Sequence, residues 1–126
     1  DFTYVDDIVE GIIRVLDKSA TPNPTFNKAK PDPSTSYAPY CIYNIGNHQP
    51  VELITFIETI ENRLAKKAIK NMLPMQSGDV VTTFADITVL QEDFGFSPST
   101  SLKEGVDKFV DWYLDYFDEK KFIGID

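Results

Sequence analysis

The sequence has almost none of the two residue types that build most nucleophilic and metal centres. Its 126 residues include one cysteine, Cys41, and one histidine, His48. A single cysteine excludes an internal disulfide and suits a reducing cytoplasm, where we expect the protein to work. Neither a cluster of metal ligands nor a Ser-His-Asp arrangement can be built from this pair, so we predict no metal site. We interpret His48 as a polar turn residue and Cys41 as a small core residue.

Positive charge and long apolar runs are also scarce. Twelve Lys and Arg against twenty Asp and Glu give a net charge of −8. Proteins that bind nucleic acid need a basic surface to displace counterions, so we expect no nucleic-acid partner. No apolar stretch approaches the roughly 20 residues that a membrane span requires, so we expect no membrane partner. The 42% apolar and 13% aromatic content is enough for a packed core and predicts a single domain.

Strand-like and helical segments alternate, which predicts an α/β fold with few short strands and about four helices. The strand-like runs are "DFTYV", "CIYNIGN" and "IKNMLPMQ". The first runs straight into a helix that ends near Ser19, with Asp6 or Asp7 as its cap. This helix is apolar around so much of its circumference that we expect it to be buried on more than one side.

Three further helices are predicted by periodicity and by capping residues. The second helix has an amphipathic stripe at 4, 3 and 4 spacing: Leu53, Ile57, Ile60 and Leu64. We place Pro50 in its first turn, where a missing N–H costs nothing. A short third helix is capped by Asp86 and terminated by Gly95. The last helix opens with the S-x-x-E capping box of Ser101 and Glu104.

Residues 20–39 form a long loop that holds five of the eight prolines. Loops of this length are usually functional or mobile. The elements on either side are too few to make a domain each, so a linker between domains is a poor fit. We interpret the loop as a flap or lid.

The stretch "YNIGNHQP" follows the order of strand, turn and helix that can present backbone amides to a phosphate. It has one glycine and lacks both G-x-G-x-x-G and G-x-x-x-x-G-K-[ST]. We therefore interpret the turn as a connector that supports a site rather than forming one.

The stretch "PMQSGDVVTTFAD" is richer in binding groups, because Gln76, Ser77, Asp79, Thr82 and Thr83 crowd polar side chains into a turn between apolar segments. A Gln amide and an exposed turn can hold phosphate or uracil edges, and an Asp can accept hydrogen bonds from ribose hydroxyls. An ordinary Ser-Gly-Asp turn explains the same residues equally well. Chemistry alone leaves both interpretations open.

Four blocks in order give the chain a resemblance to a known family: "DFTYVDDIVEGIIRVL", "APYCIYNIGNHQPVELITFIETIE", "LPMQSGDVVTTFADITVLQEDFGFSP" and "SLKEGVDKFVDWYLDYF". They resemble the C-terminal portion of extended short-chain dehydrogenase/reductase nucleotide-sugar epimerases, above all the UDP-glucuronate 4-epimerase branch of bacterial polysaccharide gene clusters. The chain also opens inside a strand-like run without an initiator Met. We therefore expect residues 1–126 to be one substrate-domain piece of a longer protein that carries a Rossmann domain ahead of it.

The resemblance implies a chemistry for the whole protein. Family members bind NAD on the Rossmann domain and use a Tyr-x-x-x-Lys pair to oxidise the C4 hydroxyl of a UDP-sugar and reduce it from the opposite face. The glycine fingerprint does not occur here, and the resemblance places the catalytic pair, like the Rossmann domain, ahead of this chain. We therefore expect this chain to hold no catalytic residue, to bind no NAD and to be inactive alone. The whole protein is expected to form a homodimer through the absent domain, and this chain is not.

The resemblance also implies four substrate-binding residues. Phe2 falls where related epimerases have an aromatic residue near the nucleotide. Within "QSGD", Gln76 and Asp79 match positions that contact phosphate and ribose, and Gln76 stands where galactose epimerases have a charged Arg. Thr83 matches a position beside the sugar, where a small side chain leaves room for a bulky or charged hexose.

Two kinds of alternative remain beside the epimerase interpretation. One is a UDP-glucuronate decarboxylase or a nucleotide-sugar dehydratase of the same fold, which only residues outside this chain would separate from an epimerase. The other is a non-catalytic acidic interaction module.

Overall fold

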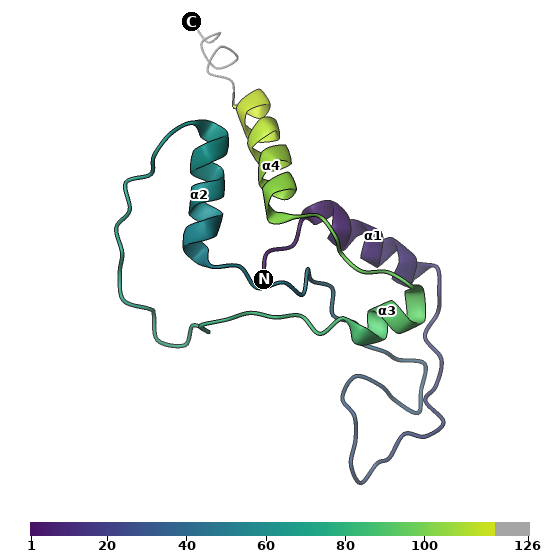
Figure 1. Cartoon of the computed structure of the whole chain (residues 1–126). Coiled ribbons are helices and arrows are strands. Elements are labelled where there is room, and N and C mark those ends of the chain that lie inside the picture. The colour runs from purple at the N-terminus through teal and green to yellow at the C-terminus, as the bar shows by residue number, and fades with distance from the viewer. Residues whose placement is uncertain (118–126) are drawn as a thin grey trace, which may run out of the picture.

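A computed structural model describes residues 1–117 of the chain. These residues form four helices, as the sequence predicts: α1 (Val5–Leu16), α2 (Leu53–Leu64), α3 (Thr88–Phe94) and α4 (Leu102–Tyr116). In Figure 1, α2 and α4 stand side by side, while α1 and α3 lie together on the other side of the molecule. None of the helices within the described residues combines the length and the apolar character needed to cross a bilayer.

The α2–α4 pair forms the first packing unit. Val106 and Val110 are the buried residues of α4, at 5% and 2% exposure. Gly105 lets the segment before α1 approach this helix closely, because a Cβ at that position would lie 3.3 Å from the ring of Tyr4. The unit therefore joins both ends of the described chain to its middle.

A second core lies where α1 and α3 meet the chain segment between residues 43 and 46. Ile87, Leu90 and Phe96 are buried there, with these partly buried side chains packed around them: Val15, Tyr43, Ile45, Ala85 and Phe94. Gly11 of α1 allows the close approach, since a Cβ there would lie 3.1 Å from Ile45 and 3.2 Å from Phe96.

The predicted strands do not form in the part of the chain that the structure describes. Its only β-type pairing is an isolated antiparallel bridge between Thr35 and Cys41. A strand needs a neighbouring strand to bond its backbone, and apolar alternation in a sequence does not supply one. The first two runs meet through side chains instead, as where the amide of Asn47 donates to the hydroxyl of Thr3 at 3.0 Å. The α/β prediction therefore gives the helices correctly but not the sheet.

The start of α1 differs from the prediction. Its N-cap is Tyr4, and neither Asp6 nor Asp7 caps it, since both lie inside the first helical turn. The carboxylate of Asp7 accepts a hydrogen bond from the amide of Thr100 at 3.0 Å and so ties α1 to the loop before α4. Both carboxylates still lie at the helix end where negative charge is favourable.

The ends of α2 and α3 are partly as predicted. Pro50 lies before α2 rather than in its first turn, since the helix begins at Leu53. Asp86 is one residue before the N-cap of α3, and its side chain accepts from the amide of Thr88 at 3.0 Å, which turns the chain into the helix. Gly95 terminates α3 in the left-handed conformation at φ +60°, which confirms the prediction.

The capping box of α4 is half formed. Ser101 is the N-cap, and its hydroxyl accepts from the amide of Glu104 at 3.2 Å. The Glu104 side chain pairs with Lys108 at 2.8 Å instead of reaching back to the cap. Only one of the two expected cap hydrogen bonds is therefore present.

The expectation that α1 is buried on more than one side is wrong within the described residues. Gly11 is its only buried residue. Five large apolar side chains on this helix are between 47% and 76% exposed: Val5, Val9, Ile12, Ile13 and Leu16. The helix packs by a narrow edge, and no described segment covers its remaining apolar surface.

The proline-rich loop 20–39 has no helix and no strand, as predicted, apart from the bridge at Thr35. It hangs below α1 and α3 in Figure 1. Side-chain oxygens of Asn23, Asn27 and Asp32 each accept from the amide two residues further on, so a series of tight turns shapes it. A lid role for this loop stays a prediction.

Candidate functional site

Phe2 lies on an apolar pocket between the first residues, α2 and α4. Its ring stacks on that of Phe56, with centroids 4.2 Å apart and planes 10° from parallel. The pocket has a volume of about 350 Å³, and other lining side chains include Tyr4, Ile60, Val106 and Phe109. Such a surface suits a flat ring or an aliphatic group, but it offers no donor set for a phosphate.

Thr83 lies next to Asp1, which forms hydrogen bonds to two other segments of the chain. The hydroxyl of Thr83 accepts from the amino group of Asp1 at 2.7 Å. The Asp1 carboxylate accepts from the amides of His48 and Ala85 at 3.1 and 3.2 Å. Gly46 permits this contact, because a Cβ there would come within 2.4 Å of the Ala85 Cβ. Thr83 is thus held beside the segment that carries Phe2.

The Gly-Asn-His turn uses its own amides within the protein. The amide of Asn47 donates to Thr3 and that of His48 to Asp1, and His48 itself takes the left-handed conformation at φ +48°. Amides already engaged by side chains do not cradle a phosphate. This geometry favours the connector interpretation of the turn.

Gln76 and Asp79 share one turn on an exposed segment that we call the arm, residues 66–84. The amide of Asp79 donates to the carbonyl of Gln76 at 3.2 Å, and Gly78 permits the turn with φ +96°. Every residue of the arm is exposed. Figure 1 shows the arm leaving the end of α2 and arching round the side of the molecule before it returns to α3.

The structure therefore brings the four predicted site residues together only in pairs. Gln76 and Asp79 are neighbours on the arm, and Thr83 adjoins the segment of Phe2. Within residues 1–117 no hydrogen bond or ion pair joins one pair to the other. A closed pocket that contains all four residues is not present in the described chain, and their binding roles stay a prediction.

Sequence reasoning missed Glu61, which is the most heavily bonded side chain near the arm. Glu61 is 4% exposed and lies in the last turn of α2. Its carboxylate accepts from Lys67 Nζ at 2.7 Å, from Lys70 Nζ at 2.5 Å and from the Ala68 amide at 3.0 Å. The hydrogen bonds from Lys67, and then those from Lys70 and Ala68, lower the pKa of Glu61 to about 2.

A signal for Glu61 was present in the sequence. It stands four residues after Ile57, on the buried face of an otherwise apolar stripe, where a charged side chain needs a partner. The lysines six and nine residues later could supply one only if the chain turned back after the helix. The chain turns back at Ala65, which takes the left-handed conformation at φ +52° although it is not a glycine.

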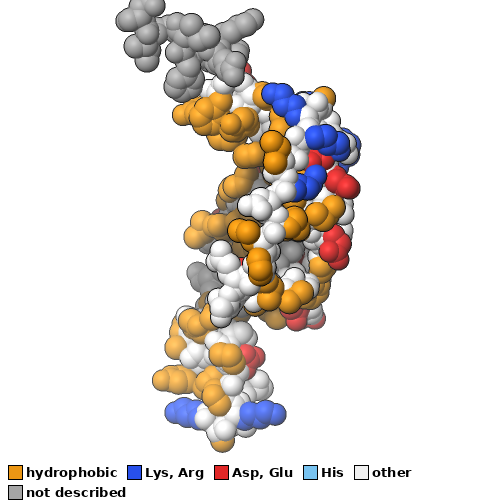
Figure 2. All heavy atoms as spheres, turned by 90° about the vertical axis from the view of Figure 1, so that its left-hand side faces the viewer, with side chains coloured by type: hydrophobic (Ala, Val, Ile, Leu, Met, Phe, Trp, Pro, Cys, Tyr) orange, Lys and Arg blue, Asp and Glu red, His pale blue; other side chains and the backbone are white. Residues whose placement is uncertain are grey.

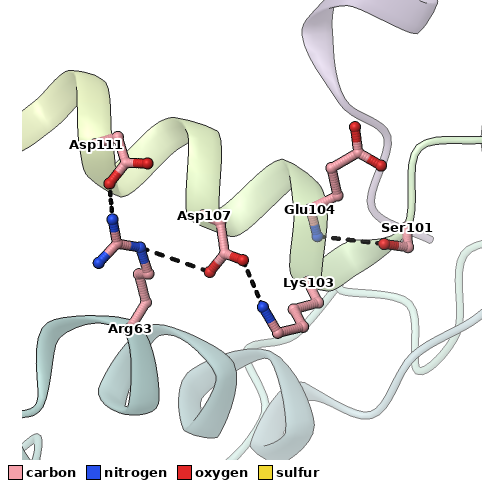
Figure 3. A network of polar contacts seen from close by, with 6 residues as sticks. All are labelled: Arg63, Ser101, Lys103, Glu104, Asp107 and Asp111. Carbon is pink, nitrogen blue, oxygen red and sulfur yellow. Dashed lines mark hydrogen bonds and ion pairs between the residues drawn. The ribbon is translucent and has the colours of Figure 1, made fainter.

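The solvent side of the α2–α4 pair is joined by a network of paired charges, drawn in Figure 3. Arg63 of α2 bonds to Asp111 and lies 3.7 Å from Asp107, which also pairs with Lys103 at 2.5 Å. Opposite charges are matched throughout, and the side chains are partly exposed. We therefore interpret the network as a helix-to-helix contact rather than a binding site.

Tyr43 links the 43–46 segment to α3. Its hydroxyl donates to the carboxylate of Asp93 at 2.5 Å. Burial first, and this hydrogen bond second, raise the pKa of Tyr43 well above its usual value. The phenol therefore stays protonated at ordinary pH and acts as a donor. No group of three or more potential metal ligands gathers anywhere in residues 1–117.

Comparison with known proteins gives the chain its relatives, although no protein-family model matches it. It is 55% identical to "Protein CapI" of Staphylococcus aureus over 93% of this chain and 35% of that protein. It is 48% identical to "Probable UDP-glucuronate 4-epimerase" of Rhizobium meliloti over 90% of this chain and 33% of that protein. It is 40% identical to "UDP-glucuronate 4-epimerase 1" of Arabidopsis thaliana over 93% of this chain and 26% of that protein.

The chain thus spans about a third or less of the length of the curated relatives that it matches. The matched stretch takes in almost all of the chain. These matches confirm the resemblance that the four sequence blocks predict. Over about 93% of its length, the chain is homologous to UDP-glucuronate 4-epimerases and to CapI.

Proposed function

We propose that this chain is the substrate-binding, C-terminal part of an NAD-dependent nucleotide-sugar 4-epimerase that interconverts UDP-glucuronate and UDP-galacturonate. The observation that carries the proposal is the identity of 40–48% to proteins named as UDP-glucuronate 4-epimerases across nine tenths of the chain. The chain covers only 26–33% of those proteins. The rest of such a protein would supply the dinucleotide-binding half and the catalytic groups.

The arm would supply polar contacts to the nucleotide. The carboxamide of Gln76 can donate to a phosphate oxygen, and the carboxylate of Asp79 can accept from ribose hydroxyls. Both side chains are exposed and make no hydrogen bond within residues 1–117, so they are available to a ligand. Thr83 would lie beside the sugar, where its small side chain leaves room for a hexose with a carboxylate.

Phe2 would contribute an aromatic surface near the nucleotide. Its ring is already fixed by stacking on Phe56 and borders the apolar pocket. A fixed ring loses little freedom when a planar base or a sugar face packs against it.

NAD does not fit the residues described here. The one turn that precedes a helix with a glycine has its amides engaged by Thr3 and Asp1. No second glycine follows in a dinucleotide fingerprint. We therefore assign the cofactor, and every chemical step, to the other part of the whole protein, and assign binding and orientation of the UDP-sugar to this chain.

A chimera tests the proposal. This chain replaces the matching third of the Rhizobium meliloti relative, and the product mixture formed from UDP-glucuronate is resolved by chromatography and NMR. We expect UDP-galacturonate, with the unmodified Rhizobium protein as the control.

Other outcomes of the same assay would overturn the proposal. A folded chimera whose product is not the C4 epimer would show that this chain does not hold UDP-glucuronate as a 4-epimerase requires. A folded chimera that leaves UDP-glucuronate unchanged, beside an active control, would favour a non-catalytic module.

A further inference from the structure

We propose that Glu61 is a positioning residue that sets the course of the arm and thereby places Gln76 and Asp79 for the nucleotide. The proposal rests on the proposed function, because the two arm residues matter only if a UDP-sugar binds there. Glu61 itself touches no substrate. It would act through the backbone that it holds.

The burial of Glu61 is the first observation. Only two polar or charged residues are buried among residues 1–117, Asn47 and Glu61. An ionised carboxylate out of water needs compensating partners. All three partners of Glu61 come from residues 67–70, at the start of the arm, and none from α4 or α1. The carboxylate therefore fixes the arm and contributes no bond between helices.

The path of the chain is the second observation. α2 ends with Ala65 in the left-handed conformation, and the amide of Lys66 donates back to the carbonyl of Glu61 at 3.1 Å. The backbone carbonyl and the side-chain carboxylate of Glu61 thus both bond to residues that follow the turn. Ile69 between the two lysines is fully exposed, so its side chain adds no apolar contact at the turn.

The far end of the arm is anchored in a similar way. The amide of Ala85 donates to the carboxylate of Asp1 at 3.2 Å, just past the arm. Residues 71–82 therefore lie between two anchors, Glu61 at one end and Asp1, which bonds to Thr83 and Ala85, at the other. Gln76 lies six residues past Lys70, within about 20 Å of extended chain, so loss of the first anchor would let the Gln76–Asp79 turn wander.

The surface of the arm agrees with this account. Figure 2 views the molecule from the side that the arm covers, where orange apolar side chains run down the face and blue basic ones gather near the top beside red acidic ones. Met72, Leu73 and Met75 are 63–75% exposed, so the middle of the arm does not pack onto the body. Its position depends on its ends.

The first test follows the arm itself and does not depend on any enzymatic activity. Amide hydrogen exchange and tryptic cleavage after Lys70 are measured on the 126-residue chain, its Glu61→Gln variant and the control Glu92→Gln on α3. We expect exchange at Ala68 and cleavage at Lys70 to rise about tenfold in Glu61→Gln, as for the loss of charged hydrogen bonds, and to stay unchanged in Glu92→Gln. Unchanged protection of the arm in a folded Glu61→Gln variant would overturn the proposal.

A milder variant guards against misfolding. Lys67→Met removes one exposed partner and leaves the bonds from Lys70 and Ala68, so α2 stays intact. It should loosen the arm in the same direction but less than Glu61→Gln. If Lys67→Met left both exchange and cleavage unchanged, the claim that the lysine bonds hold the arm would fail.

The second test separates positioning from a purely structural role. In the chimera with the Rhizobium protein, Glu61→Gln should raise KM for UDP-glucuronate about tenfold and change kcat less than about twofold, because only binding geometry is altered. Glu61→Asp, which keeps the charge, should recover part of the loss. A KM equal to that of the unsubstituted chimera would overturn the positioning role.

The two failures can be told apart. An inactive unsubstituted chimera would contradict the proposed function, while the exchange data on the arm would still stand. An active chimera whose KM ignores Glu61→Gln would contradict the positioning role alone.

Discussion

At the scale of single residues, the chain's unusual groups serve attachment rather than chemistry. Glu61 and Asp1 hold the two ends of the arm through backbone amides and lysine ammonium groups. Tyr43 and Asp93 join the 43–46 segment to α3. Each of these side chains is bonded to another segment of the chain.

The pH dependence of the arm follows from Glu61. Its hydrogen bonds with Lys67 and Lys70 lower the pKa of Glu61 from 4.5 to about 2. A lowered folded-state pKa contributes stability that is complete above about 4.5 and is lost as the pH falls through about 2. We expect amide protection at Ala68 to fall across this window in the natural chain. In Glu61→Gln it should be low and flat, and a parallel fall in both proteins would contradict the assignment.

Gly46 is the second residue with a specific structural demand. A Cβ there would meet the Ala85 Cβ at 2.4 Å, so Gly46→Ala forces two backbone segments apart. We expect a loss of about 1–3 kcal/mol in the free energy of unfolding, measured by urea titration.

Ala85→Gly provides the matched control for that prediction. It removes the clashing methyl group, so the double variant should lose less stability than the sum of the two single changes. Strict additivity would show that the contact does not limit Gly46.

At the scale of elements, capping residues in the local sequence stabilise the ends of the helices. Ser101 accepts from the Glu104 amide at 3.2 Å, and no second cap bond supports it. We expect Ser101→Ala to lower the free energy of unfolding by about 1 kcal/mol. Ser99→Ala, in the preceding loop, is the control. Equal effects of both changes in urea titrations would contradict the capping role.

Helices were predictable because their signals are local. The 3–4 spacing of apolar residues in α2, the Ser101 cap of α4 and Gly95 after α3 all lie in or next to the helix that they define. The strands were not predictable in this way. The run "CIYNIGN" indicates only an apolar, extended segment, and its pairing depends on another segment. The prediction that α1 is buried on more than one side is wrong for the same reason. An apolar stripe shows which face of a helix another segment can cover, but not whether any segment covers it.

The candidate site was predictable only in part. Composition and resemblance picked out Gln76 and Asp79, which do share one turn. Glu61 escaped, because its partners lie six to nine residues away beyond a left-handed Ala65. A reversal without glycine leaves little trace in a sequence, so the bond that it creates could not be foreseen.

At the scale of the whole molecule, the described residues combine a small core with wide exposed apolar surfaces. Among residues 1–117 few apolar residues are buried, whereas α1 exposes Leu16 at 76% and α4 exposes Phe109 and Trp112 at 52% and 53%. Exposed patches of this kind usually mark surfaces that another body covers. Together with the one-third coverage of the relatives, this supports the proposal that the chain works as part of a longer protein.

The isolated chain should therefore bind a UDP-sugar poorly. Its net charge of −8 repels a ligand with about three negative charges, and its candidate contacts lie on two separate segments. We expect titration of UDP-glucuronate into labelled chain to give a dissociation constant weaker than about 100 µM. Tighter binding would show that this part alone forms the site.

The most direct test of the central claim is the product that the chimera forms from UDP-glucuronate. If this chain is the substrate-binding part of a 4-epimerase, the chimera with the Rhizobium meliloti protein yields UDP-galacturonate, and Asp79→Ala in the grafted chain weakens substrate binding. If a folded chimera forms no 4-epimer while the unmodified Rhizobium protein does, the account is contradicted.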